Sequence, residues 1–474
     1  MAAISSPGIG SGLDVNSIVT QLVAIERRPI TLLQQQATSV QSKLSIYGQL
    51  QSKLSALRDA AAALGQSGTW GQTLGASSDP ASVGVTTGAA TRAGSYQVQV
   101  TALAAAQSNA TAASYASVDA VLGEGTLQIQ LGSWSGTSFT AKAGAASVLL
   151  TIGPGAQTLA QVRDAINASN SGVTASVLSD ASGARLVLRS AATGAVNGFR
   201  IGTTDSGAGG LSALAFDPQN GISTMTLAQT AADAQATIDN LPVTSASNTL
   251  AGVIDGITLT LSKLTTAPVQ INATADTDAI RKKIDTLVAA YNEVNSLLAL
   301  QTKYDDATKI AGALQGDSAA LGIRSQLRTM LGVTSGASSV FSRLSEIGFD
   351  VKTDGSISLG AGKLTSGLAN LAEITRLFSN SDPVTPANDG IATQLRRLTD
   401  RMLAFDGTVQ SHTEGLRHKL DLNQDRQDRL EDRVTRVEAR LRAQYAVLDA
   451  QMNQLTGLSN YVQQQIANWN KSTA

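Results

Sequence analysis

The chain has 474 residues, a formal net charge of −1 and no cysteine. A chain of this length exceeds the size of one hydrophobic core, so two to four domains are expected. The balanced charge argues against nucleic acid or an anionic membrane as a partner, the lack of cysteine excludes disulfides and thiolate chemistry, and the sequence has no run of about 18 apolar residues that could span a membrane.

Residues 1–12 are small and rich in glycine, but the glycine spacing does not match a dinucleotide-binding fingerprint. They also lack the basic and apolar regions of a cleavable signal peptide, so no secretory leader is expected. Asp14 is a candidate N-cap for a helix, and Pro29 should either kink that helix or begin a new one. Four apolar side chains share one face of the expected helix: Val15, Ile18, Leu22 and Ile25.

Residues 29–64 predict a second long helical pattern, which Gly65 should end. Apolar residues recur at a spacing of seven, and leucines follow three residues after the later members, as in the seam of a coiled coil. The members are Leu33, Val40, Tyr47, Leu54 and Ala61, together with Leu50, Leu57 and Leu64.

Between residues 76 and 272 charged residues become sparse, and alternating apolar positions replace the seven-residue spacing. Turns rich in Gly, Ser, Asn and Asp separate the expected strands. The pattern predicts one or two mostly antiparallel β domains. The clearest strands are expected at residues 96–100, 127–131, 257–261 and 269–271.

One segment of this region predicts a βαββ unit. A strand at 148–152 precedes a short helix that Thr158 should cap, and a strand pair follows at 173–178 and 185–189. No titratable cluster accompanies the unit, which favours a plain packing module.

Helices return after residue 273. Amphipathic helices are expected at 280–298 and 319–331, and helical segments follow at 364–378 and 391–405. A β-hairpin that turns at Asp354-Gly355 is expected between them, and residues 381–390, with two prolines, should form a loop.

Residues 416–469 read as one long helix with heptad spacing. Polar residues at the later d positions weaken the seam toward the C-terminus, which favours a segment that binds another chain. An intramolecular helical hairpin is the open alternative, because both ends of the chain carry seams that could pack on each other. The a positions are Leu420, Gln427, Val434, Leu441, Leu448, Leu455, Val462 and Trp469, and the d positions are Leu416, Asn423, Leu430, Val437, Gln444, Gln451, Leu458 and Gln465.

No constellation of catalytic residues is visible. His412 and His418 lie among charged residues at the start of the last helix, where solvent exposure is expected. Gly316-Asp317-Ser318 lacks the closing glycine of a nucleophile elbow, and Asp317 or Ser318 should instead cap the next helix. The sequence therefore predicts a protein that is not an enzyme and that uses no cofactor or metal.

Several motifs resemble one family. The stretch GSGLDVNSIVTQLV at residues 10–23 closely resembles the N-terminus of the flagellar hook-associated protein 2 family, the filament cap proteins. EARLRAQY at 438–445 and YVQQQ at 461–465 are similar to the closing helix of that family. LQGDS at 314–318 and LSEIGF at 344–349 resemble its helical core, and residues 158–190 are similar to a module shared by flagellin-like proteins.

The resemblance implies an α+β multidomain fold, with long terminal coiled-coil helices and a helical core domain that carries an inserted, mostly antiparallel β region. It implies a terminal "leg" that contacts the growing filament. The implied domains are an N-terminal leg helix at 1–40, a helical core at 41–75 and 273–435, a β domain at 76–110 and 227–272, a second β-rich domain with the βαββ module at 111–226, and a C-terminal leg coiled coil at 436–474. The implied contact residues are Leu13, Ile18, Leu22, Ile25, Leu33, Leu441, Leu448, Leu455, Leu458 and Val462.

The resemblance further implies a secreted structural assembly factor at the distal tip of the bacterial flagellum, which promotes flagellin polymerisation and prevents the loss of exported flagellin. The implied partners are other copies in a homo-oligomeric, pentamer-like ring, flagellin, the hook–filament junction proteins and an export chaperone, with no nucleic acid and no membrane insertion. A seam does not count subunits, so the sequence leaves the stoichiometry open. The alternatives are a filament or junction subunit and a tip-exposed adhesin.

Overall fold

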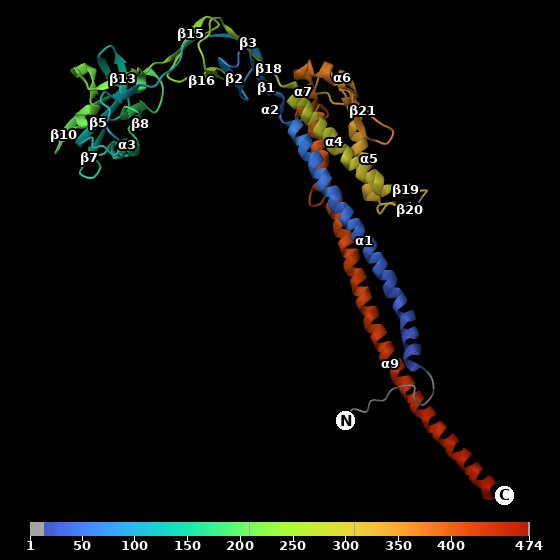
Figure 1. Ribbon diagram of the computed structural model, residues 1–474. Coiled ribbons are helices and arrows are strands. Elements are labelled where there is room, and N and C mark those ends of the chain that lie inside the picture. The colour runs from blue at the N-terminus through green and yellow to red at the C-terminus, as the bar shows by residue number, and fades with distance from the viewer. Residues whose placement is uncertain (1–13, 208, 308, 473–474) are drawn as a thin grey trace. The chain divides into compact units, whose positions relative to one another are not determined.

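The computed structural model describes residues 14–207, 209–307 and 309–472. The chain forms two compact units, one made of the chain up to Trp70 and from Arg281 onward, the other of residues 71–280. The predicted class is confirmed: long terminal helices and a helical core accompany an inserted antiparallel β region (Figure 1). The finer division into seven segments stays a prediction. None of the described helices is long and apolar enough to cross a membrane.

The helical unit contains two long helices and a set of shorter ones. Its helices are α1 Val15–Gly65, α2 Ser67–Trp70, α4 Thr277–Thr302, α5 Ser318–Leu331, α6 Ala361–Leu368, α7 Leu371–Ser379, α8 Ile391–Leu403 and α9 Thr408–Ser472, of which α4 begins in the last residues of the β unit. Two small hairpins complete it: β19 Tyr304–Asp305 with β20 Ile310–Ala311, and β21 Phe349–Val351 with β22 Ile357–Leu359.

The ends of α1 are set by local chemistry. The Asp14 side chain caps the helix by accepting a hydrogen bond from the Ser17 amide at 3.0 Å, as predicted. The helix continues through Pro29, so the alternative in which a new helix begins there is wrong. At the other end the Trp70 indole donates to the Leu64 carbonyl at 2.9 Å, which supplies a partner for one of the last carbonyls of the helix.

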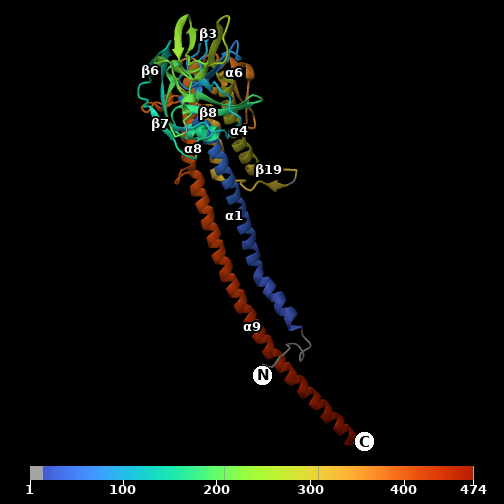
Figure 2. The ribbon, with the colours of Figure 1, turned by 60° about the vertical axis from the view of Figure 1, so that its left-hand side comes forward.

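Helices α8 and α9 run antiparallel to α1 in one continuous register (Figures 1 and 2). In each side-chain pair that joins α1 to α8 or α9, the two residue numbers add up to 458 or 459, so the antiparallel register does not shift along the helices. The intramolecular pairing is therefore confirmed for this part of the last helix. The pairs are Arg58–Asp400, Tyr47–His412, Arg27–Glu431, Glu26–Arg433 and Asn16–Arg442.

The second half of α1 forms the centre of the helical core. The predicted seam is confirmed there, because the members from Tyr47 to Leu64 are fully buried, whereas Leu33 and Val40 are half-buried. The predicted helical segment 364–378 is divided into α6 and α7. The break falls at Ala369–Asn370.

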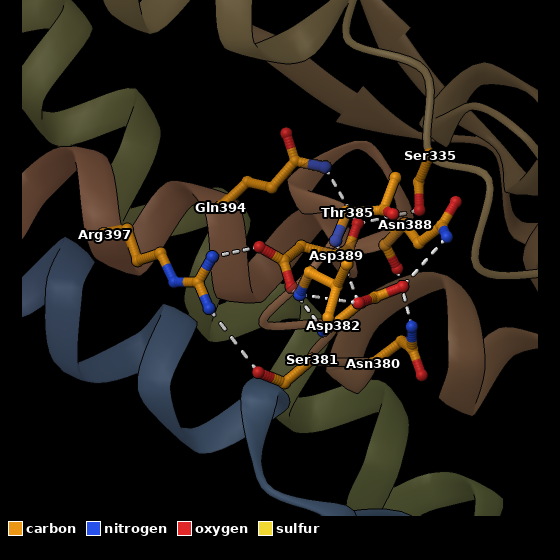
Figure 3. A network of polar contacts seen from close by, with 10 residues as sticks. Ser335, Asn380, Ser381, Asp382, Thr385, Asn388, Asp389, Gln394 and Arg397 are labelled. Carbon is orange, nitrogen blue, oxygen red and sulfur yellow. Dashed lines mark hydrogen bonds and ion pairs between the residues drawn. The ribbon is translucent and has the colours of Figure 1, made fainter.

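The predicted loop at 381–390 is organised around the buried Asp389 (Figure 3). Its carboxylate forms an ion pair with Arg397 and accepts a hydrogen bond from the Asp382 amide at 2.8 Å. Its backbone carbonyl accepts from Ser335 Oγ and Gln394 Nε2, each at 2.8 Å. These contacts fix the loop against α8 and satisfy a buried charge that would otherwise be costly.

The β unit contains antiparallel sheets packed around two hydrophobic clusters. The first cluster lies between a five-stranded sheet, β1-β18-β3-β14-β15, and a three-stranded sheet, β16-β17-β2, and is rich in Val and Ile. Its strands are β1 Thr73–Ser77, β2 Val83–Thr87, β3 Gly94–Ala102, β14 Ala234–Ile238, β15 Leu241–Ser245, β16 Thr249–Ile254, β17 Ile257–Leu261 and β18 Val269–Ala275. All strands predicted here are confirmed.

The second cluster includes the predicted βαββ unit, which is confirmed. Thr158 and Gln161 form a capping box at the start of α3, whose Leu159, Val162 and Ile166 are fully buried. The elements are β4 Ser108–Thr111, β5 Glu124–Ser135, β6 Ser138–Ala141, β7 Val148–Ile152, α3 Leu159–Ala168, β8 Val173–Asp180, β9 Gly183–Ser190, β10 Gly198–Ser206, β11 Phe216–Asp217, β12 Ile222–Ser223 and β13 Met225–Gln229.

Candidate assembly surface

A narrow apolar seam joins the first part of α1 to α9. Val434 on α9 is buried, and Leu430, Leu441 and Tyr445 pack partly buried beside it. Burial of these side chains, rather than helix propensity, holds two long helices together. The buried α1 residues are Val15, Val19, Val23 and Ile30.

The buried face of α1 differs from the predicted one. Leu22 and Ile25, which were expected to share the seam face with Val15, are 37% and 56% exposed. Successive residues of a helix are turned by about 100° around its axis, and on this basis the centre of the buried face lies roughly 90° around α1 from the centre of the predicted stripe. Helix α1 therefore carries two apolar stripes, one against α9 and one facing solvent.

Beyond Tyr445, helix α9 continues past the described part of α1 for roughly 40 Å at 1.5 Å per residue. Its apolar side chains there occupy a, d, e and g positions, yet each is between 36% and 60% exposed. A contiguous row of exposed apolar side chains is typical of interaction surfaces. We call this set the distal stripe: Val447, Leu448, Met452, Leu455, Leu458, Tyr461, Val462 and Ile466.

The ten predicted contact residues fall into three groups. Leu13 lies outside the described residues. Ile18, Leu33 and Leu441 are half-buried. The six that are exposed are Leu22 and Ile25 on α1, and Leu448, Leu455, Leu458 and Val462 on α9. Leu448 was expected to be buried as an a residue and is 41% exposed instead, because no α1 residue lies opposite it in the described part of the chain. Their role as contacts stays a prediction.

The seam and the distal stripe should respond differently to truncation of one side chain. Val434→Ala is expected to destabilise the α1–α9 pair by about 2 kcal/mol, since it removes two buried methyl groups. Leu455→Ala should leave stability unchanged because Leu455 is 59% exposed. Thermal melts and hydrogen exchange along α1 would measure both. Equal effects of the two substitutions would contradict this division.

A polar cluster fastens α9 to the helical core where the two long helices leave it. Asp317 caps α5 by accepting from the Ala319 and Ala320 amides, each at 3.1 Å. It also accepts from the Tyr47 hydroxyl at 2.7 Å and lies 3.0 Å from His412 Nε2. The rings of Tyr47 and His412 stack with centroids 4.6 Å apart. One carboxylate thus connects α1, α5 and α9.

This cluster corrects the expectation that both histidines are solvated. His418 is exposed, but the His412 side chain is only 29% exposed and meets a carboxylate that is 4% exposed. Asp317 is acceptor-only when ionised, so His412 Nε2 carries the hydrogen. The capping role of Asp317 could be predicted from the neighbouring residues. Its contact with His412 could not, because the two residues are 95 positions apart and no sequence pattern connects them.

The electrostatics of the cluster favour an ionised Asp317. Burial by itself raises the pKa of this carboxyl group, but the hydrogen bonds from Tyr47 and the Ala320 amide, and the nearby His412, lower the pKa below its ordinary value of 3.8. Burial and the contact with Asp317 raise the pKa of the Tyr47 phenol, so it remains a donor.

The lowered pKa of Asp317 predicts a specific acid response. Because the folded protein binds this proton less readily than the unfolded chain, the contribution to stability is complete above the ordinary pKa of 3.8 and is lost as the pH falls through the folded-state pKa. Urea unfolding of the native protein and of Asp317→Asn should differ at pH 7 and converge toward pH 3. A difference that stays constant with pH would contradict the assignment.

The described residues hold no group of three or more His, Asp or Glu side chains placed to bind a metal ion. The paired terminal helices, the inserted β unit and the exposed distal stripe define an α+β multidomain protein of the class with long terminal helices.

Comparisons with known proteins agree with this class. A family model described as the flagellar hook-associated protein 2 C-terminus matches residues 231–457, one for its N-terminus matches 11–107, and one for the flagellin hook IN motif matches 150–192, which includes most of the βαββ unit. Flagellar hook-associated protein 2 of Escherichia coli K12 is 31% identical over 481 residues, 99% of both chains, and that of Salmonella typhimurium LT2 is 30% identical over the full length of both. The chain belongs to the flagellar hook-associated protein 2 family.

A solved structure is similar over most of the fold. The crystal structure of the flagellar cap protein FliD D1-D2-D3 domains from Escherichia coli superposes with a TM-score of 0.64 and 28% identity, covering 78% of this chain and 99% of that one. The resemblance inferred from the sequence motifs is therefore confirmed.

Proposed function

We propose that this protein caps the distal tip of the bacterial flagellar filament, where it promotes the insertion of exported flagellin and keeps it from being lost to the medium. Membership of the family and the similarity to a solved flagellar cap protein support the proposal. The distal stripe supports the proposal structurally, because a cap must hold the end of a filament and the apolar side chains of this stripe are exposed.

The terminal helices form the leg that contacts the filament in this proposal. The leg comprises residues 1–40 and 436–474, with contacts from the exposed stripe of α1 and from the distal stripe of α9. An apolar stripe on a long helix matches a partner that offers a groove between its own helices. In this proposal several copies form a ring at the tip. The protein also binds an export chaperone and the hook–filament junction proteins before it reaches the filament tip.

Gold-labelled antibody electron microscopy on intact flagella tests the location. Label confined to the distal tips is the expected result. Label along the shaft would identify a filament subunit, and label at the base would identify a junction subunit. Cells from which the gene is deleted should release flagellin into the medium and should regain filaments when the intact gene is restored.

A further inference from the structure

The break between α8 and α9 displays an aromatic side chain to solvent. The two helices pair with α1 in one register, yet residues 404–407 leave the helical path and expose Phe405 to 84%. An exposed phenylalanine leaves a large apolar surface in water, and an interrupted helix loses backbone hydrogen bonds that a continuous helix would have. Local features that break such rules concentrate at functional sites.

This turn is rigidly built. Met402 before it and Val409 after it are each 2% exposed, so both sides are anchored in the core. The Gly407 amide donates to the Ala404 carbonyl at 2.8 Å. A Cβ atom at Gly407 would lie 2.4 Å from the Arg401 carbonyl oxygen, so only glycine permits this close approach. The turn therefore takes the backbone of Phe405 out of the helical path, and its side chain is exposed to solvent.

A complementary cavity lies elsewhere on the helical unit. It has a volume of about 450 Å³, and its lining includes the apolar Leu331, Val351 and Ile357 and the charged Arg328, Arg343 and Asp350. Both arginines and Val351 are exposed. The volume is in the range of pockets that bury small organic ligands, so it has room for one aromatic ring. The two arginines outnumber the single carboxylate of Asp350, so the lining is net positive, and Asp406, exposed beside Phe405, has the opposite charge.

The turn that carries Phe405 and the hairpin that lines this cavity belong to different parts of the helical unit. In Figure 1 the turn between α8 and α9 emerges on one side of α1, whereas β21, which lines the cavity, lies on the other. A knob and a cavity on different faces of one molecule can meet only between two copies. Such a heterologous contact repeats from copy to copy and closes into a ring or continues as a helix.

We propose that Phe405 of one copy inserts into the cavity lined by Leu331, Val351 and Ile357 of a second copy, with Asp406 facing Arg328 and Arg343. The contact adds to the proposed cap function the surface through which neighbouring copies associate. It is tested with purified full-length protein alone, so its failure is separate from a failure to cap filaments.

Sedimentation velocity over a range of protein concentrations measures the association. Phe405→Ala should weaken it by about 30-fold, the effect of losing a central aromatic anchor. Phe405→Asp and Val351→Arg should each give monomers, whereas Val384→Asp, at an apolar residue that is 86% exposed, should associate like the native protein. Circular dichroism checks that each variant is folded, which is expected because all three positions are exposed.

Mixing the two monomeric variants gives the decisive result. The Phe405→Asp variant retains an intact cavity, and the Val351→Arg variant retains Phe405. Each molecule in an equal mixture can therefore make one contact only, so dimers and nothing larger should form. Asp406→Arg should weaken association, and Asp406→Arg combined with Arg343→Asp should restore it. A native protein that stays monomeric at its highest soluble concentration, normal association of Phe405→Asp, or a mixture without dimers would each overturn the proposal.

Discussion

Deletion of residues 446–474 is expected to abolish capping while leaving the fold of both units intact. The deleted segment carries the distal stripe, whereas Leu441 and Tyr445, which pack against α1, are retained. Cells that produce only the shortened protein should lack normal filaments and release flagellin into the medium. Electron microscopy and immunoblots of culture supernatants measure this, and thermal melts of the purified protein should shift little.

Point substitutions separate the stripe from the length of the helix. Leu455→Asp combined with Leu458→Asp should reproduce the capping defect, since both side chains are about 60% exposed and the folded monomer does not need them. Asn453→Asp combined with Asn460→Asp adds the same charge at exposed f positions on the opposite face and should be tolerated. Normal filaments in the leucine variant would refute the assignment of the distal stripe as the filament contact.

Asp317→Ala is expected to destabilise the helical unit by about 3 kcal/mol. The substitution removes the cap of α5, which is worth about 1 kcal/mol, and leaves the buried Tyr47 hydroxyl without its acceptor, which costs about 1–3 kcal/mol. The melting temperature of the helical unit should fall by roughly 10 °C.

The control for this change is Asp317→Asn, which retains an oxygen for Tyr47 and for the α5 amides and should cost less than half as much. Differential scanning calorimetry can follow the helical and β units as separate transitions. An unchanged transition for Asp317→Ala would mean that the cluster does not stabilise the junction of α1, α5 and α9.

Features that depend on neighbouring residues could be predicted from the sequence. The caps at Asp14, Thr158 and Asp317 are confirmed, because a capping side chain binds an amide only two or three residues away. The strands and the hairpin at Asp354-Gly355 are confirmed for the same reason, since alternation and turn chemistry are local.

Features that depend on distant residues could not be predicted. Helix α1 has two apolar stripes. The stripe with Val19 and Val23 packs against α9, whereas the stripe with Leu22 and Ile25 is exposed, and the sequence of α1 alone does not distinguish them. The contact between His412 and Asp317 depends on the pairing register, which exists only once the helices have met. Partner contacts of the distal stripe belong to another molecule and cannot be read from one chain.

The pairing of α1 with α9 joins the two extremes of the sequence, as in the Asn16–Arg442 contact, whose residues are 426 positions apart. Contacts of such separation close a very long loop, which costs chain entropy. A copy that stops before residue 430 lacks Val434, which forms one hydrophobic cluster with Val19 and Val23. The apolar face of α1 is therefore covered only by residues from the opposite end of the sequence, so α1 has no partner helix during most of the synthesis of the chain.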